Sequence, residues 1–305
     1  MRLATFRDVT GTRIGVVRGE RLTDVARAAV LAGEEPPVEL REMQALIEAG
    51  EPALRRVASL LHGAPEQAEM PLASVELLAP IPRPRKNIFC LGRNYAEHAV
   101  ESLRAAGQEV KLPTYPNVFT KAPTSITGPF TDIPYDASVT PELDWEVELA
   151  VVIGRAGRHI AKSDALAHVW GYTILNDVSA RDIQHKPGVQ FFQGKSLDAS
   201  SPVGPWIVTA DEIAGPQNLR MLLRINGEVK QDDTTGNMLF DVATIIETLT
   251  RVLTLEPGDI IATGTPAGVG FARTPPEFLR PGDLMESEIE GIGTLRNRIV
   301  EVQQR

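Results

Sequence analysis

The sequence is poor in cysteine and has no long apolar run. Cys90 is the single cysteine among 305 residues, so no disulfide can form within the chain, and a reducing compartment fits. Because Cys90 lies in the apolar run 88–91, we expect a buried structural thiol rather than a nucleophile. No uncharged stretch reaches the roughly 20 residues of a membrane span, and the first residues form no apolar leader. The sequence therefore predicts a cytoplasmic protein without a membrane partner.

Positive charge is also in short supply. The chain has 31 Lys and Arg against 40 Asp and Glu, which gives a formal net charge of -9. This acidity argues against nucleic acid or an anionic membrane as the main partner. It does not exclude an anionic small molecule, because a metal ion and a few cationic side chains can reverse the field inside a pocket.

The order of apolar patterns and turn residues predicts two parts. In the first part, short strands are expected at 3–6, 13–17 and 22–25, and helices at 39–47 and 52–61. Three alternate prolines in the segment 80–86 forbid a helix and favour an extended linker. We therefore predict a small α+β domain at 1–80 and a larger domain at 86–305.

The larger part is dominated by short β-type runs. The clearest lie at 148–153, 221–225, 260–262 and 284–289, and one amphipathic helix is expected at 241–253. Strands do not alternate regularly with helices, which argues against a doubly wound parallel sheet. The predicted class is α+β, with a mixed, rolled or barrel-like sheet in the larger domain.

Two acidic motifs are candidate metal ligands. Glu146 and Glu148 alternate along a predicted strand and therefore point to the same side, just before a strongly apolar run. Paired carboxylates at the mouth of a buried strand suit a hard cation, although an exposed acidic edge strand is the alternative. Asp177 ends a second apolar strand, where it could add a third carboxylate or serve as a helix cap.

Three further motifs could act on a substrate. His98 and Glu101 are three residues apart, so on a helix the carboxylate could orient the imidazole as a base, although such spacing is common in surface pairs. Lys195 follows two phenylalanines and needs an anionic partner, either a substrate or a structural carboxylate. The glycine-rich segment 263–270 lacks the ending of a Walker loop, and it is either a turn or a backbone site for a carboxylate.

These motifs, in this order, resemble the fumarylacetoacetate hydrolase family, with the N-terminal part similar to that of its longer bacterial members. The motifs are Arg93-Asn94-Tyr95 with His98 and Glu101, Leu143-Asp144-x-Glu146-x-Glu148, Asn176 to Asp182, Gly194-Lys195-Ser196 and Gly264-Thr265-Pro266-x-Gly268. The resemblance implies that Glu146, Glu148 and Asp177 bind Mg²⁺ or Mn²⁺, and that His98, Glu101 and Lys195 are catalytic. It also implies substrate contacts from Arg93, Tyr95, Arg181, Gln184 and Thr265, a β-roll fold and a homodimer.

The reaction that we expect is hydrolysis of a C–C bond in an acylpyruvate-type 2-oxo acid, with water activated by His98. The alternatives are decarboxylation of an oxaloacetate-like acid, isomerisation of a hydroxymuconate-type diacid on the same site, and a non-catalytic ligand-binding role. The segment 98–111 has few large apolar residues, so we expect it to form a mobile lid. The apolar strands and the region around Trp206 are expected to contribute to dimer formation.

Overall fold

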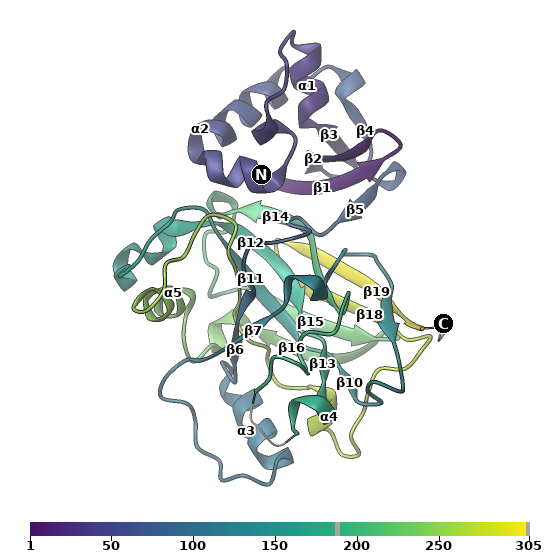
Figure 1. Cartoon of the computed structure of the whole chain (residues 1–305), viewed down its shortest axis with the longest axis vertical. Helices are drawn as coiled ribbons and strands as arrows, with labels where there is room; N and C mark the ends of the chain where they lie inside the picture. The colour runs from purple at the N-terminus through teal and green to yellow at the C-terminus, as the bar shows by residue number, and fades with distance from the viewer. Residues whose placement is uncertain (187–189, 303–305) are drawn as a thin grey trace.

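The computed structural model describes residues 1–186 and 190–302. Its first part is the expected small α+β module, which lies at the top of Figure 1. Its elements are β1 (Arg2–Asp8), β2 (Gly11–Arg18), β3 (Arg21–Asp24), α1 (Val25–Leu31), α2 (Met43–His62), β4 (Glu69–Pro71) and β5 (Glu76–Leu78). The helical patterns expected at 39–47 and 52–61 correspond to the two halves of α2, which are separated by a kink where Gly50 takes a φ of 68° and Pro52 follows it; residues 39–42 lie before the helix.

The remainder is a strand-rich unit with three helices in its described part. Its elements are β6 (Ile88–Gly92), α3 (Ala96–Ala105), β7 (Asn117–Lys121), β8 (Ile126–Thr127), β9 (Ile133–Tyr135), β10 (Leu143–Asp144), β11 (Val147–Ile153), β12 (Val169–Asn176), β13 (Ser179–Ala180), α4 (Arg181–Gln184), β14 (Ser201–Thr209), β15 (Arg220–Ile225), β16 (Glu228–Thr234), α5 (Val242–Thr250), β17 (Ile260–Ala262), β18 (Leu284–Ile289) and β19 (Gly293–Glu301). The four β-type runs expected here lie in β11, β15, β17 and β18. Asp241 caps α5 by accepting a hydrogen bond from the Thr244 N–H.

One large sheet crosses from the first part into the second. Its strand order is β4-β3-β2-β1-β14-β12-β11-β17-β6-β7, and a separate sheet has the order β16-β15-β18-β19-β9. β1 pairs antiparallel with β14, with Arg2 opposite Val208 and Leu3 opposite Ile207. Main-chain hydrogen bonds therefore join the two parts, in addition to the linker. The boundary at 80–86, as a division between separate domains, stays a prediction.

The central strands are buried on both faces. Alternate residues of β11 enter different cores: Leu149 and Val151 face the five-stranded sheet and α5, whereas Ala150 and Val152 face the core that contains α2. The sheets remain open, and the mixed α+β class with rolled sheets is confirmed. Among the described residues, no helix is long and apolar enough to cross a membrane.

The region around Trp206 is covered within the chain. The Arg2 guanidinium lies 5.6 Å from the ring centre of Trp206, and the indole N–H donates to the Ile292 carbonyl at 2.7 Å. Trp206 also packs against the small apolar cluster of the N-terminal module. The N-terminal module therefore shields part of this region, and its contribution to a dimer stays a prediction.

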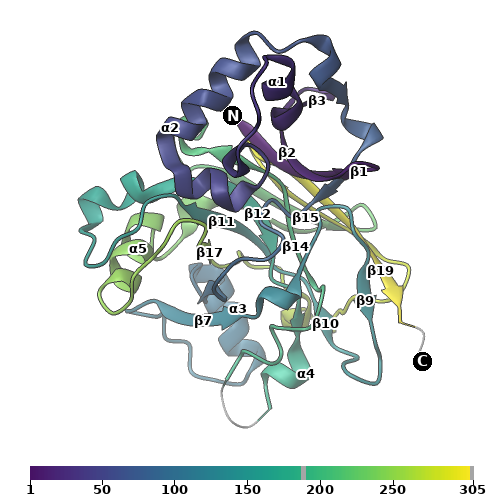
Figure 2. The ribbon, with the colours of Figure 1, turned by 45° about the horizontal axis from the view of Figure 1, so that its top comes forward.

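Strand direction gathers several chain segments at one end of the large sheet. β11 runs antiparallel to β12 and β17, β17 runs parallel to β6, and β6 runs antiparallel to β7. The starts of β7 and β11 therefore lie beside the ends of β6, β12 and β17. In Figures 1 and 2 this end, with α3 and α4, lies away from the N-terminal module. The polar motifs found in the sequence meet here.

Candidate active site

Three carboxylates converge at this end of the sheet, as the sequence predicts. Glu146, Glu148 and Asp177 are buried, and each offers an oxygen within 4.8 Å of the others. Glu146 and Asp177 lie between the short β10–β13 ladder and the long β11–β12 ladder. There the Asp177 N–H donates to the Glu146 carbonyl at 2.8 Å, and the Asn176 side chain accepts from the Glu146 N–H at 3.0 Å. The backbone itself thus fixes two of the three carboxylates side by side.

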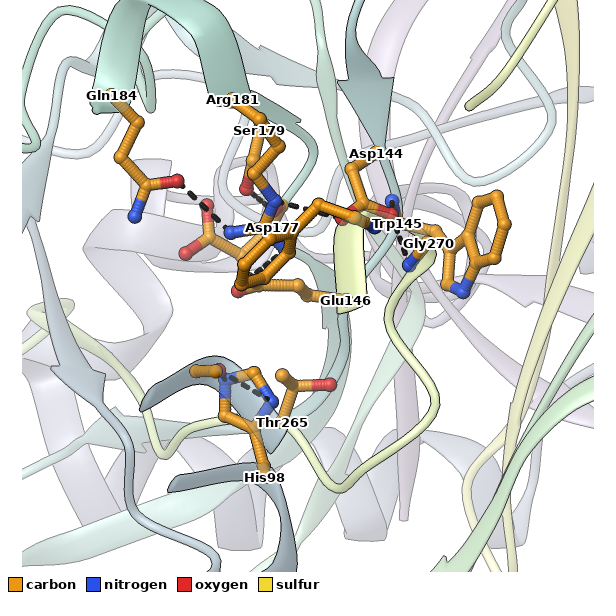
Figure 3. Close-up of polar contacts among 12 residues, drawn as sticks. His98, Asp144, Trp145, Glu146, Asp177, Ser179, Arg181, Gln184, Thr265 and Gly270 are labelled. Atoms are coloured by element: carbon orange, nitrogen blue, oxygen red, sulfur yellow. Dashed lines mark hydrogen bonds and ion pairs between the residues drawn. The ribbon is translucent and has the colours of Figure 1, made fainter. Parts of the chain in front are cut away.

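Three buried cations surround these acids. The Lys195 ammonium donates to Glu146 at 2.7 Å and to Asp177 at 2.8 Å. Lys121 donates to the other Asp177 oxygen at 2.6 Å. Arg181 donates to Glu146 at 2.6 Å, as Figure 3 shows. The side chains of all three cations are at most 3% exposed to solvent.

A fourth carboxylate, Asp144, holds Arg181 in place. It accepts from the Arg181 Nε at 2.7 Å and from the backbone N–H groups of Gly270 and Phe271 at 2.7 and 3.1 Å. The Arg181 guanidinium also lies 4.4 Å from the ring centre of Phe271. Asp144 therefore positions the arginine from behind, while Glu146 contacts it from the side of the pocket.

The cations act unequally on the carboxylates. Burial alone would raise the pKa of Glu146, but the charges of Lys195 and Arg181 outweigh it and lower the pKa to about 2. The pKa of Glu148 is raised well above its ordinary value, first by burial and then by the charges of Asp177 and Glu146. Glu148 accepts a hydrogen bond from the Gly264 N–H at 2.8 Å. It is thus the acid whose charge is least compensated.

The charge count fits a divalent cation. Four buried acids, Asp144, Glu146, Glu148 and Asp177, face the three cations Lys121, Arg181 and Lys195, which leaves one negative charge in excess where water is excluded. Such an excess is costly in a protein interior unless a positive group binds there. Clustered carboxylate oxygens are also the ligands that Mg²⁺ and Mn²⁺ prefer.

The His98–Glu101 pair lies on α3. His98 is buried, and its Nδ1 is 2.9 Å from the Glu101 carboxylate. Both Glu101 oxygens accept from the Gly268 N–H at 3.0 Å. Gly268 has a φ of +106°, and a Cβ there would lie 2.1 Å from the Lys230 carbonyl oxygen, so only glycine permits this contact. A carboxylate held in this way fixes the imidazole tautomer and leaves Nε2 as the basic nitrogen.

The lid expected at 98–111 needs correction at its start. In the structure, residues up to Ala105 belong to the regular helix α3, which buries Ser102 and Leu103 along with His98. His98 already lines the pocket, so no closure is required to bring the imidazole there. Only the stretch that follows, up to β7, lacks regular structure, and its mobility stays a prediction.

A cavity of about 650 Å³ has both Glu146 and the His98 imidazole in its wall. It is lined by Arg93, His98, Glu146, Arg181, Gln184, Lys195 and Thr265, among others. Figure 3 shows His98 and Thr265 on one side of Glu146, and Arg181 and Gln184 on the other. Most of the residues predicted to act on a substrate therefore share one cavity.

Tyr95 is placed elsewhere. Its side chain is fully buried, its hydroxyl donates to the Met221 sulfur at 3.0 Å, and it does not line the cavity. The expected substrate contact from Tyr95 is therefore corrected, because the chain turns after Arg93 and directs the phenol into the core. Thr265 lines the cavity, but its hydroxyl donates to the Val147 carbonyl at 2.9 Å and accepts from Gln231 at 2.8 Å.

Sequence reasoning missed Lys121 and Gln231. Lys121 ends the short strand β7, in which polar and apolar residues are mixed, so no local signal marks the lysine. Gln231 lies on β16, where its side-chain oxygen accepts from the Val147 N–H at 3.0 Å and its side-chain nitrogen donates to the Pro266 carbonyl at 2.8 Å. It thereby ties the start of β11 to the turn that carries Thr265, and no sequence motif marks it.

The chain is similar to several known proteins. Residues 87–300 match the family described as fumarylacetoacetate (FAA) hydrolase C-terminal. Oxaloacetate tautomerase YisK of Bacillus subtilis (strain 168) is 50% identical over 228 residues, which cover 75% of this chain and 74% of that protein. The mitochondrial oxaloacetate tautomerase FAHD2A of Homo sapiens is 40% identical over 307 residues, covering 98% and 92%. A solved structure of maleylpyruvate hydrolase from Sphingobium sp. SYK-6, in complex with manganese(II) ion and pyruvate, matches with a TM-score of 0.77 and 32% identity over 99% of this chain and 100% of that one.

Proposed function

The chain belongs to the fumarylacetoacetate hydrolase family, and on that premise we propose that it interconverts the keto and enol forms of oxaloacetate or a closely related 2-oxo diacid. The observation that carries the proposal is His98, held by Glu101, in the wall of a cavity that is also lined by Glu146 and Lys195. A base beside a site for a 2-oxo acid is what removal of a proton next to a ketone requires. The names of the relatives at 50% and 40% identity support the choice of substrate.

We propose that Glu146, Glu148 and Asp177 bind the divalent cation, Mg²⁺ or Mn²⁺. When bound, this ion supplies a Lewis acid that polarises the 2-oxo group. The neighbouring solved structure, which contains manganese and pyruvate, supports a divalent cation together with a 2-oxo acid in this family. Lys195, which lines the cavity, contributes a second positive charge close to the oxygen at C2.

The residues of the chain then move one proton off carbon. His98 Nε2 takes the proton from C3, and the C–H electron pair becomes the C2–C3 double bond. The carbonyl π electron pair moves onto the C2 oxygen, which receives a proton from a water molecule, and the imidazolium returns its proton to that water, so that His98 and the water are both restored. Glu101 stabilises the imidazolium that forms, because Gly268 holds its carboxylate against Nδ1. No water is consumed and no carbon–carbon bond breaks.

Hydrolysis of a C–C bond, the reaction expected first from the sequence, is the second candidate. There the same imidazole would activate water, and the likeness to a maleylpyruvate hydrolase favours it. We place tautomerisation first because the relatives of higher identity carry that name. Decarboxylation, isomerisation of an unsaturated diacid and non-catalytic binding are alternatives that the following experiment also separates.

The test follows enol absorbance of oxaloacetate with the Mn²⁺-loaded protein. We expect faster decay of the enol signal without release of pyruvate or of a second acid, which coupled assays and NMR detect. His98→Asn should lower the rate by about 10²–10⁴-fold, the usual effect of losing a general base. His62→Asn, at the exposed end of α2, is the matched control and should keep full activity. Stoichiometric pyruvate would identify a decarboxylase, and cleavage of acylpyruvates alone would identify a hydrolase.

We also propose a homodimer, as the family resemblance implies. Exposed apolar side chains, among them Val110, Leu112 and Tyr115 before β7, support an interface on the second part of the chain. Light scattering at micromolar concentration should give twice the mass of the chain, and a monomer would refute the proposal. A cytoplasmic location stays a prediction, since the relatives include mitochondrial proteins.

A further inference from the structure

Arg93 is a cation in the cavity wall that has no acidic partner in the described part of the chain. Its side chain is half-buried and lines the cavity. Desolvation lowers the pKa of its guanidinium, and no nearby carboxylate offsets this effect. The other cations of the site differ, since Lys121, Arg181 and Lys195 each contact at least one carboxylate. A desolvated cation without an anion is unfavourable by itself and is ready to receive one.

The backbone holds Arg93 in an unusual conformation. Its φ is +57°, in the left-handed region that side chains other than glycine seldom adopt. The next residue, Asn94, fixes this turn: its amide donates to the Thr263 carbonyl at 2.7 Å and to Phe240 at 3.0 Å, and accepts from the Phe240 N–H at 2.9 Å. Strain maintained by such surroundings is concentrated at functional sites. The arginine is therefore presented to the cavity by a rigid support.

The part of the cavity near Arg93 is electropositive. The pKa of the His185 imidazole is lowered, first by desolvation and then by the charges of Arg181, Lys195 and Arg93. Lys186 adds another cation to the lining. Among the acids of the site, in contrast, Asp144, Glu146 and Asp177 are already paired with Lys121, Arg181 or Lys195. The wall of the cavity thus contains Glu146 of the acid cluster and, in addition, the basic side chains Arg93, His185 and Lys186.

We propose that Arg93 binds the second carboxylate of the substrate, the one remote from the 2-oxo acid group, and so selects diacids over monoacids. The inference rests on the proposed function for the position of the reacting end. A diacid pairs with the Arg93 guanidinium, whereas a monoacid of the same length leaves the cation desolvated and unpaired. That difference provides discrimination without any change at the metal ligands.

The test compares the binding of two stable 2-hydroxy acids, malate and lactate, which differ by the remote carboxylate. Calorimetry on the Mn²⁺-loaded protein should show tighter binding of malate. Arg93→Met should weaken malate about 10–100-fold, the range for a lost hydrogen-bonded charge pair, and change lactate less than about twofold. Arg93→Lys, which keeps the charge, should retain most of the preference. The melting temperature of Arg93→Met should not fall, because the variant removes a half-buried charge that has no acidic partner among the described residues.

Several outcomes would overturn the proposal. Equal affinity of the wild-type protein for malate and lactate, including no detectable binding of either, contradicts it. So does a parallel loss of both ligands in Arg93→Met, or a loss accompanied by a lower melting temperature, since either indicates a structural role. Failure of the tautomerase assay is distinguishable, because the malate-to-lactate ratio is measured without turnover.

Discussion

Two clusters of charged side chains differ in how their charges are balanced. In the N-terminal module, Arg13 pairs with Asp8 and Asp24, both at 2.7 Å. At the far end of the sheet, four acids meet three cations, and every side chain of the described ion pairs there is at most 6% exposed. Each cluster has one acid in excess. In the first, Asp24 is 3% exposed, but the side chains of Arg13 and Asp8 are 18% and 21% exposed, so water can screen the surplus at Asp8.

An excess of one charge therefore has a large energetic effect only where water is excluded. Surface ion pairs contribute little to stability, since solvent replaces a lost partner. In the interior, an uncompensated acid must change its protonation or acquire a cation. The raised pKa of Glu148 and the close approach of three carboxylates are two signs of the same condition. The Arg13 cluster is therefore structural, and the buried cluster is arranged for a ligand.

The largest expected effect comes from removing a cation from each cluster. Lys121→Met should lower the free energy of unfolding of the metal-free protein by about 3–5 kcal/mol, because four buried acids would then share only two cations and one Asp177 oxygen would lose its partner. Arg13→Met, the matched change, should cost about 1 kcal/mol or less. Denaturant unfolding measures both, and Mn²⁺ should restore part of the loss in Lys121→Met only. Equal losses of unfolding free energy in the two variants would contradict the claim that the two clusters differ in how their charges are balanced.

Removing an acid from each cluster should separate them by metal affinity. Glu148→Gln should weaken Mn²⁺ binding by more than about 100-fold, since changes in outer partners alone cost about 10–100-fold. Asp8→Asn should leave Mn²⁺ binding unchanged, because Asp8 contacts only the Arg13 cluster among the described residues. Titration calorimetry gives both values. Normal Mn²⁺ affinity in Glu148→Gln would remove Glu148 from the ligand set.

The smallest effect concerns pH. The hydrogen bond from Arg13, followed by that from Thr10, lowers the pKa of Asp8 below its ordinary value of 3.8. A carboxyl with a lowered pKa stabilises the folded state above its ordinary pKa, and the stabilisation is lost as the pH falls toward the lowered value. Asp8→Asn should thus cost about 0.2–1 kcal/mol at pH 7, and the difference should shrink below pH 3.8. A difference that grows on acidification would show that Asp8 is not held as its contacts indicate.

Much of the site could be predicted because its signals are local. The two-residue period predicted that Glu146, just before β11, and Glu148, on β11, point to the same side, and the apolar run after them indicated that the strand is buried. The strand that ends at Asn176 placed Asp177 beside them. The spacing of His98 and Glu101 predicted one helix face, and the pair is in contact at 2.9 Å.

Features that depend on distant pairing could not be predicted. Lys121 contacts Asp177 across 56 residues, and Arg181 contacts Asp144 across 37, with no periodicity linking either pair. The direction of the Tyr95 side chain depends on the left-handed backbone conformation of Arg93, and the sequence does not predict that conformation because arginine seldom adopts it. The pairing of β1 with β14 joins residues about 200 apart, so the sequence showed the linker but not the shared sheet.

That shared sheet has a consequence for solubility. β14 is nine residues long, and β1 pairs with its Ile207 and Val208. A protein beginning at residue 86 would lose β1 and leave this part of β14 with unpaired N–H and C=O groups beside a newly uncovered apolar face. Open edges of this kind recruit strands from other molecules. The N-terminal module therefore also protects the large sheet against edge-to-edge aggregation.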